Sequence, residues 1–180
     1  RQRQMCIETV RTKAEGGEQA LSHKEYLAFL HLILDTDCAD LLDIEFFTAG
    51  ADLPKLVEQA HSAGVAVVCS SHDFAKTPPR AELVSRMVQM QQAGADLPKL
   101  AVMPRCRSDV LELLAATAEM ADHHPETPVI TMSMGALGAV SRLAGETFGS
   151  AMTFANPGQA SAPGQVSLGI VNEVLNALHL

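Results

Sequence analysis

Short apolar segments alternate with amphipathic segments along nearly the whole chain. The apolar segments have the length of buried β-strands and span residues 6–12, 40–47, 65–72, 98–103, 129–134 and 150–154. The amphipathic segments carry apolar residues at helical spacing, near residues 18–36, 52–63, 79–93, 107–122, 136–146 and 166–179. Six predicted strands that alternate with helices indicate an α/β fold with a parallel sheet.

Charged side chains lie within, or at the ends of, several of these apolar strands: Arg11, Asp43, Glu45, His72 and Lys99. The alternation alone fits both a doubly wound sheet and a (β/α)8 barrel, the TIM barrel. An open sheet covered on both faces would bury such charges at a high cost, whereas a barrel can gather them in one pocket at its strand ends. The pattern therefore favours a TIM barrel of which this chain supplies about six β/α units, as a single incomplete domain over residues 1–180.

The composition is that of a folded domain that handles small molecules. The 180 residues are 47% hydrophobic, which is enough for one core, and the net charge of -8 argues against a nucleic-acid partner. No apolar run reaches the ~20 residues of a membrane span, so no membrane partner is expected. The first residues, RQRQ, contain no apolar signal region.

The four cysteines are widely spaced along the chain: Cys6, Cys38, Cys69 and Cys106. They form no CxxC pair, so we expect neither a zinc site nor a redox motif. A chain of this length and apolar content does not need disulfides for stability. We therefore expect reduced thiols and a cytoplasmic location.

An eight-residue sequence, AGADLPKL, occurs twice, and its two lysines are predicted to differ in role. The first copy runs into VEQAHSAG, a helix start that leaves Lys55 exposed, and the second runs into the apolar strand AVMP. Burial of Lys99 would favour a neutral amine, which can attack a carbonyl. The commoner alternative for such a lysine is an ammonium group that reaches solvent from the start of a strand.

His72 ends the apolar segment VAVVCSSH, at the strand end where catalytic groups collect in parallel α/β proteins. An imidazole there can transfer protons near neutral pH, although a histidine that merely caps the loop is the simpler alternative. Arg11 and Glu15 frame the loop RTKAEGGEQ, whose two glycines suit either a simple turn or an anion-binding turn.

Asp43 and Glu45 are two residues apart on one predicted strand and therefore face the same side. A pair of carboxylates can serve as acid and base. We expect them instead to form ion pairs that hold Arg11 or Lys99 in place.

Arg142 directly follows MSMGALGAVS, at the start of a predicted helix, and Ser161 and Gln165 lie in a polar loop further along the chain. An arginine, a hydroxyl and an amide together suit a ligand that carries a carboxylate. Each of them alone is unremarkable.

Several segments together resemble the type I 3-dehydroquinate dehydratases. The matching segments are VRTKAEGGEQ, DLLDIEFF, VCSSHDFAKTP, GADLPKLAVMP, VITMSMGALGAVSRLAGETFGS and SAPGQVS. They follow the family's order and spacing and together span nearly all of the chain. The resemblance implies a (β/α)8 barrel, usually a homodimer, that needs neither a metal nor an organic cofactor.

The resemblance also implies roles for individual residues. Lys99 matches the lysine that forms the Schiff base, His72 the general acid–base, and Glu15 the glutamate that positions this histidine. Arg11 matches an arginine on the hydroxyl side of the substrate. The residues that match the carboxylate-binding and apolar groups of the pocket are Arg142, Ser161, Gln165, Met132, Met134 and Phe148.

The reaction implied by the resemblance is the syn elimination of water from 3-dehydroquinate to give 3-dehydroshikimate, a step of the shikimate pathway of aromatic amino acid biosynthesis. Lys99 would condense with the ketone to an iminium, which acidifies the adjacent CH2 without a metal. His72 would remove a proton there and return it to the departing hydroxyl. Arg142 would hold the carboxylate and so fix the leaving group relative to His72.

The sequence departs from the family pattern at its N-terminal end. Family members carry two more barrel strands ahead of the first strand here, and the second ends in a Glu-x-Arg motif that contacts substrate hydroxyls. The sequence therefore leaves three alternatives beside the dehydratase: a fragment that binds substrate poorly and turns over slowly, another Schiff-base enzyme such as a class I aldolase, and a non-catalytic module.

Overall fold

The computed structural model describes residues 5–36, 38–158 and 162–178. Its centre is a parallel sheet of five strands, each paired with the next strand along the chain. The strands are β1 (Ile7–Thr9), β2 (Leu41–Glu45), β3 (Ala66–Asp73), β4 (Leu97–Val102) and β5 (Ile130–Ser133). Parallel neighbours that follow one another in the chain need crossover helices, so the predicted parallel α/β fold is confirmed.

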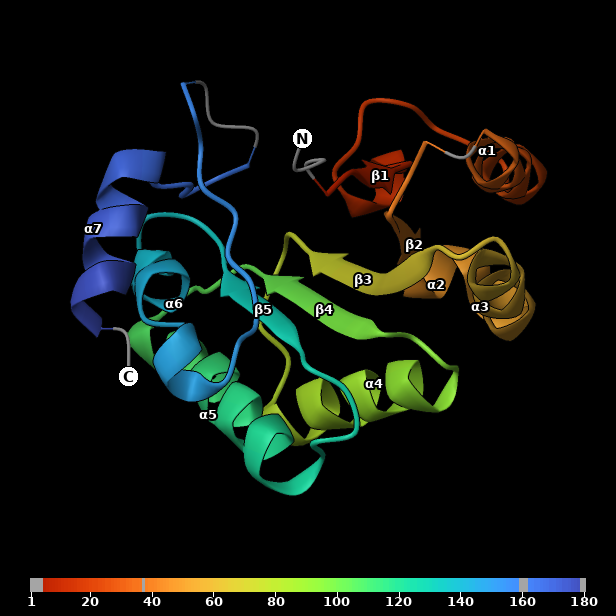
Figure 1. Ribbon diagram of the computed structural model, residues 1–180. Helices are drawn as coiled ribbons and strands as arrows, with labels where there is room; N and C mark the ends of the chain where they lie inside the picture. The colour runs from red at the N-terminus through yellow and green to blue at the C-terminus, as the bar shows by residue number, and fades with distance from the viewer. Residues whose placement is uncertain (1–4, 37, 159–161, 179–180) are drawn as a thin grey trace.

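Helices connect the strands and pack against the sheet (Figure 1). They are α1 (His23–Asp35), α2 (Phe46–Ala49), α3 (Leu53–Ser62), α4 (Arg80–Gln92), α5 (Arg107–His123), α6 (Ala139–Leu143) and α7 (Leu168–Leu178), with the 3-10 turns η1 (Lys13–Glu15), η2 (Gly50–Asp52) and η3 (Glu146–Phe148). In Figure 1, α4 and α5 lie side by side beneath the sheet, where they pack against β4 and β5. In the described part of the chain, no helix combines the length and the apolar character needed to cross a bilayer.

Alternate residues of each strand point to opposite faces of the sheet, and the two faces differ in character. The face toward the helices is apolar, with Leu42, Ile44, Val67, Cys69, Leu100 and Val102 in its core. The inner face has a smaller apolar cluster that contains Leu41, Val68, Ala101, Ile130 and Met132. The charged residues of β2, β3 and β4 lie further along this inner face, so the strand register itself brings them together.

The predicted sixth strand, residues 150–154, is not a strand in the structure. Its backbone pairing with the sheet is an isolated bridge between Val129 and Ser150, with the Ala151 N–H donating to the Val129 carbonyl at 2.8 Å. The Ser150 hydroxyl accepts the next available N–H, that of Thr131, at 3.1 Å. A side chain thus takes the hydrogen bond that would continue the ladder, and the described residues contribute five strands to the sheet rather than six.

The two AGADLPKL copies form different structures, as predicted. Lys55 is exposed on α3, whereas Lys99 is 7% exposed on β4. The cysteines Cys6, Cys38, Cys69 and Cys106 are all unpaired.

Candidate active site

A cavity of about 510 Å³ lies on the inner face of the sheet, toward the ends of the strands. All five strands, or the loops that follow them, contribute to its wall. The lining residues are Ile7, Thr9, Arg11, Glu15, Gly16, Gly17, Glu18, Asp43, His72, Phe74, Lys99, Ala101, Met132, Met134, Arg142, Phe154, Ala162 and Gln165. Cavities at this end of a parallel α/β sheet are where such proteins bind small molecules.

Lys99 enters the cavity from the middle of β4. Its Nζ donates a hydrogen bond of 2.9 Å to Oδ2 of Asp43 and lies 4.7 Å from the centre of the Phe154 ring. The alternative of an ammonium group extended into solvent is therefore wrong, because the amine is held inside the cavity between a carboxylate and an aromatic face.

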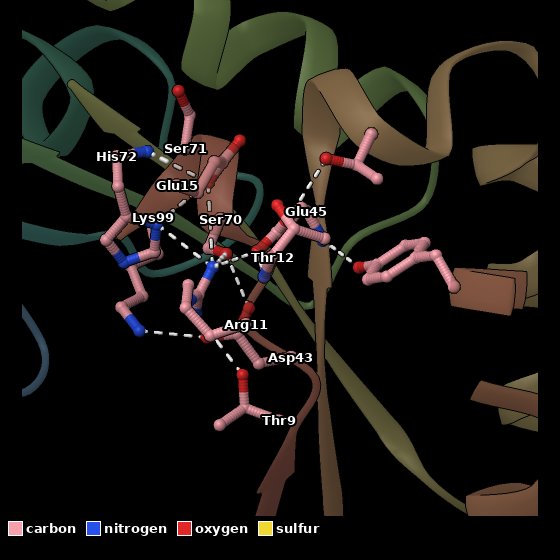
Figure 2. Close-up of polar contacts among 12 residues, drawn as sticks. Thr9, Arg11, Thr12, Glu15, Asp43, Glu45, Ser70, Ser71, His72 and Lys99 are labelled. Atoms are coloured by element: carbon pink, nitrogen blue, oxygen red, sulfur yellow. Dashed lines mark hydrogen bonds and ion pairs between the residues drawn. The ribbon is translucent and has the colours of Figure 1, made fainter. Parts of the chain in front are cut away.

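Asp43 on β2 joins the two cations of the site (Figure 2). Its Oδ2 accepts from Lys99 and from Nη2 of Arg11, the latter at 2.8 Å, while its Oδ1 accepts from the Ser70 hydroxyl. Burial alone would raise the pKa of Asp43, but the charges of Lys99 and Arg11 outweigh burial and lower it. The predicted ion pairing of Asp43 is confirmed, and Asp43 binds both candidate cations at once.

Glu45 is fully buried and fastens the loop after β1 to the end of β2. Its carboxylate accepts the Thr12 N–H at 2.8 Å, the Thr12 hydroxyl at 2.7 Å and the Thr48 hydroxyl at 2.6 Å. It also pairs with Nη1 of Arg11 at 3.2 Å. Glu45 therefore fixes the start of the loop that carries Arg11 and Glu15, as expected for an ion-pair partner rather than an acid or base.

His72 meets Glu15 and Arg11 through one ring nitrogen. Its Nδ1 lies 2.9 Å from Oε2 of Glu15 and 3.0 Å from Nη1 of Arg11. Burial, helped by the charges of Arg11 and Lys99, lowers the pKa of His72 to about 3. Burial, followed by the charge of Glu45, raises the pKa of Glu15 to about 8. The imidazole is therefore neutral at neutral pH, and Nε2 is the ring nitrogen left for a ligand.

Arg142 is 2% exposed on α6 and contributes its guanidinium to the cavity wall. Its Nη2 donates to the Pro163 carbonyl at 3.3 Å and its Nη1 lies 3.4 Å from the Met132 sulfur. Its Nε is buried and has no hydrogen-bond partner among the described residues, and burial lowers the pKa of Arg142. A buried guanidinium with a free donor is suited to bind an anionic group.

The structure brings together most of the predicted site residues. The cavity wall contains Lys99, His72, Glu15, Arg11, Arg142, Gln165, Met132 and Met134. Ser161 lies outside the described residues.

Phe148 is the predicted pocket residue that does not line the cavity. It lies on η3, which packs against helix α5. Phe74 and Phe154 supply the aromatic walls instead. Phe74 follows His72 in the HDF sequence, and Phe154 is the last residue of the sixth predicted strand. Position at the end of a predicted strand was the signal that could have identified both.

A metal site is not evident around the cavity. No group of three or more His, Cys, Asp or Glu side chains within residues 5–36, 38–158 and 162–178 is arranged to hold a metal ion. The polar groups that could hold an organic ligand are the lysine, the histidine and the two arginines described above.

Comparison with known proteins gives a consistent result. The model of the type I 3-dehydroquinase family matches residues 2–180. A 3-dehydroquinate dehydratase of Salmonella agona is 48% identical over 171 residues, which are 95% of this chain and 68% of the relative.

Two solved structures resemble the chain closely. A type I 3-dehydroquinate dehydratase of Clostridium difficile with covalently modified comenic acid has a TM-score of 0.92 at 47% identity, covering 97% of this chain and 69% of that one. A 3-dehydroquinate dehydratase of Geobacillus kaustophilus has a TM-score of 0.92 at 39% identity, covering 97% of this chain and 67% of that one.

Proposed function

Because this chain belongs to the type I 3-dehydroquinase family, we propose that it dehydrates 3-dehydroquinate to 3-dehydroshikimate through a Schiff base on Lys99. The observation that carries the assignment of residues is the position of the Lys99 amine, which shares one cavity with His72 and Arg142. A nucleophilic amine, a neutral base and an anion-binding guanidinium are the three groups that the reaction requires.

Condensation of the substrate ketone with Lys99 gives an iminium, and its nitrogen draws electrons from the adjacent CH2. His72, neutral and buried, removes one proton from that carbon and returns it to the departing hydroxyl on the same face. In the tautomer that this step requires, Nδ1 carries the ring hydrogen and donates it to Oε2 of Glu15, so that the lone pair of Nε2 can take the substrate proton. The iminium serves as the electron sink, so this route requires neither a metal nor an organic cofactor.

The carboxylate and the hydroxyls of the substrate determine its orientation in the cavity. Arg142 and Gln165 bind the carboxylate at one end. Ser161, which lies outside the described residues, is assigned to the same group by the family resemblance alone. Arg11 faces the hydroxyl side, and Met132, Met134 and the aromatic residues cover the ring. A substrate held at both ends presents its ketone to Lys99 in one orientation.

Borohydride trapping tests the proposal directly. The chain is incubated with 3-dehydroquinate and sodium borohydride, digested and examined by mass spectrometry. We expect an adduct on the Lys99 peptide that is absent from Lys99→Ala. Lys55→Ala is the matched control, because Lys55 lies in the identical sequence AGADLPKL but is exposed on α3. An unmodified Lys99 peptide in the presence of 3-dehydroquinate contradicts the proposal.

We also propose that residues 1–180 form a single, incomplete TIM-barrel domain that assembles into a cytoplasmic homodimer. Exposed apolar side chains on α6 and α7, namely Val140, Leu168 and Ile170, support an association surface. Exposed unpaired thiols at Cys38 and Cys106 suit a reducing compartment. Light scattering coupled to size-exclusion chromatography tests the dimer, and a monomer at micromolar concentration contradicts it.

A further inference from the structure

We infer that Asp43 is the counter-ion of the iminium that forms on the Lys99 nitrogen. The inference rests on the proposed function and deepens it. It gives a role to a carboxylate that lies in direct contact with the reacting atom.

Hydrogen bonds to both carboxylate oxygens hold the Asp43 side chain in place. Oδ2 lies 2.9 Å from the Lys99 Nζ and 2.8 Å from Nη2 of Arg11, while Oδ1 accepts from the Ser70 hydroxyl. The residue is 2% exposed and lies on β2, next to the strand that carries Ser70. Such a carboxylate cannot turn away when the substrate binds, so it stays beside the nitrogen.

The neighbouring carboxyl groups are committed to other partners. Glu45 is occupied by Thr12, Thr48 and Arg11, and burial raises the pKa of Glu15 to about 8, so that Glu15 is largely uncharged at neutral pH. Within the described part of the chain, Asp43 is the carboxylate that accepts a hydrogen bond from Lys99. Its pKa is lowered by the cations despite burial, so it remains ionised and is not the proton acceptor of the reaction.

The charge balance of Schiff-base formation explains what Asp43 does. The neutral amine forms the C–N bond, a proton moves from nitrogen to oxygen, and the carbinolamine that results carries no charge at nitrogen. Its C–O bond then breaks and the hydroxyl leaves as water with one proton taken from the solvent, which leaves one N–H and a positive charge on the C=N nitrogen. Asp43 gains no proton in this sequence. Its fixed negative charge stabilises the iminium over the neutral carbinolamine.

The test measures iminium formation in variants of the full 180-residue chain. In Asp43→Ala, the initial rate of borohydride trapping with 3-dehydroquinate should fall on the order of 10- to 150-fold, the effect of one lost hydrogen bond between charged groups. Added formate should restore part of that rate because it returns a carboxylate to the space left by the side chain. Formamide, which has the same size and no charge, should not restore it.

Two further variants separate this role from a loss of folding. Ser70→Ala keeps the charge of Asp43 but frees Oδ1, and we expect a smaller fall in trapping rate. Asp96→Asn is the control, because Asp96 accepts from the Val67 N–H and His61 at the start of β4, outside the cavity. Its trapping rate should match that of the unsubstituted chain.

The outcomes distinguish this inference from the proposed function. If the unsubstituted chain traps no adduct on Lys99, the proposed function fails. If it does trap the adduct and Asp43→Ala, shown by circular dichroism to be folded, traps at a rate within twofold of it, the counter-ion role is wrong. A folded Asp43→Ala whose rate falls but responds equally to formate and formamide also overturns it.

Discussion

The carboxyl group of Glu15 lies 2.9 Å from Nδ1 of His72, and burial disfavours the charged form of each. The pKa of Glu15 is raised to about 8 and that of His72 is lowered to about 3. The pair is therefore an uncharged acid beside an uncharged base over most of the physiological range. It is a hydrogen-bonded pair rather than an ion pair, and its two members affect stability in opposite directions as the pH changes.

We predict that the contribution of Glu15 and His72 to the free energy of unfolding is greatest between about pH 4.5 and 6.5. Below pH 4.5 the unfolded chain binds a proton on His72 that the folded chain does not, so the free energy of unfolding rises with pH. Above pH 6.5 the folded chain still holds the Glu15 proton that the unfolded chain has lost, so the free energy falls until about pH 8. Between these limits the two slopes cancel. Urea denaturation across this pH range measures the profile.

Glu15→Gln is the matched variant for this prediction because it keeps the size of the side chain and removes its titration. We expect the fall between pH 6.5 and 8 to disappear and the rise to continue up to pH 6.5, because the slope of His72 is no longer cancelled. A fall of unchanged size in Glu15→Gln means that another group causes it.

His72→Asn should separate Schiff-base formation from elimination. The variant keeps the Lys99 amine and its Asp43 partner but has no group to move a proton between carbon and hydroxyl. Turnover should fall by about 10²- to 10⁴-fold, the usual contribution of general acid–base catalysis. Borohydride should still trap an adduct, now derived from substrate and heavier by one water than the product-derived adduct.

The control for this variant is His61→Asn, which removes a histidine that pairs with Asp96 and whose side chain is 44% exposed. Its turnover should be unchanged. Loss of the borohydride adduct in folded His72→Asn contradicts the separation, because it shows that His72 is needed before the iminium forms.

The amino-acid pattern determines some features of this fold and leaves others to contacts between distant segments. The alternation of segments was sufficient for the parallel fold, and the charges within strands were sufficient to place Lys99, His72 and Asp43 on one face, because side-chain direction alternates strictly along a strand. Sequence pattern could not show that Ser150 replaces a ladder bond with its hydroxyl, since that depends on the position of Thr131 on β5.

The pocket aromatics show the same limit. Phe148 and Phe154 are close in sequence and equally apolar, and only the path of the chain after α6 decides which one faces the cavity. The pairing of Asp43 with two cations at once depends in the same way on contacts between strands that are distant in sequence. The local sequence pattern shows on which face of a strand a side chain lies, but it does not show which side chain it contacts.

Arg142→Lys should weaken substrate binding more than it slows the chemistry. A lysine keeps the charge but loses the planar set of donors that binds a carboxylate through two hydrogen bonds. We expect KM to rise by about 10- to 150-fold, the equivalent of one hydrogen bond between charged groups, with a smaller fall in kcat.

Steady-state kinetics checks the Arg142 prediction, with Arg80→Lys as the control. Arg80 is an exposed arginine at the start of α4 that pairs with Glu119. A second measurement uses the methyl ester of the substrate, which has no carboxylate charge and should bind equally to the unsubstituted chain and to Arg142→Lys. An unchanged KM for the free acid contradicts the proposed place of the carboxylate.

Gly17 should be indispensable for the loop that carries Arg11 and Glu15. A Cβ at this position would lie 2.0 Å from the Arg11 carbonyl oxygen and 2.6 Å from the carbonyl carbon, which are backbone atoms that cannot rotate away. Gly17→Ala must therefore push the backbone at residue 11 outward, and the Arg11 guanidinium and the Glu15 carboxyl move with it. Because a displacement of about 1 Å in a catalytic group can lower turnover about 10²-fold, we expect kcat/KM to fall on that order. Gly158→Ala is the control, since a Cβ there meets no described atom within 4 Å.

Gly17→Ala with unchanged kcat/KM would show that the loop can shift without disturbing His72, and the positioning role given to Glu15 would then be wrong.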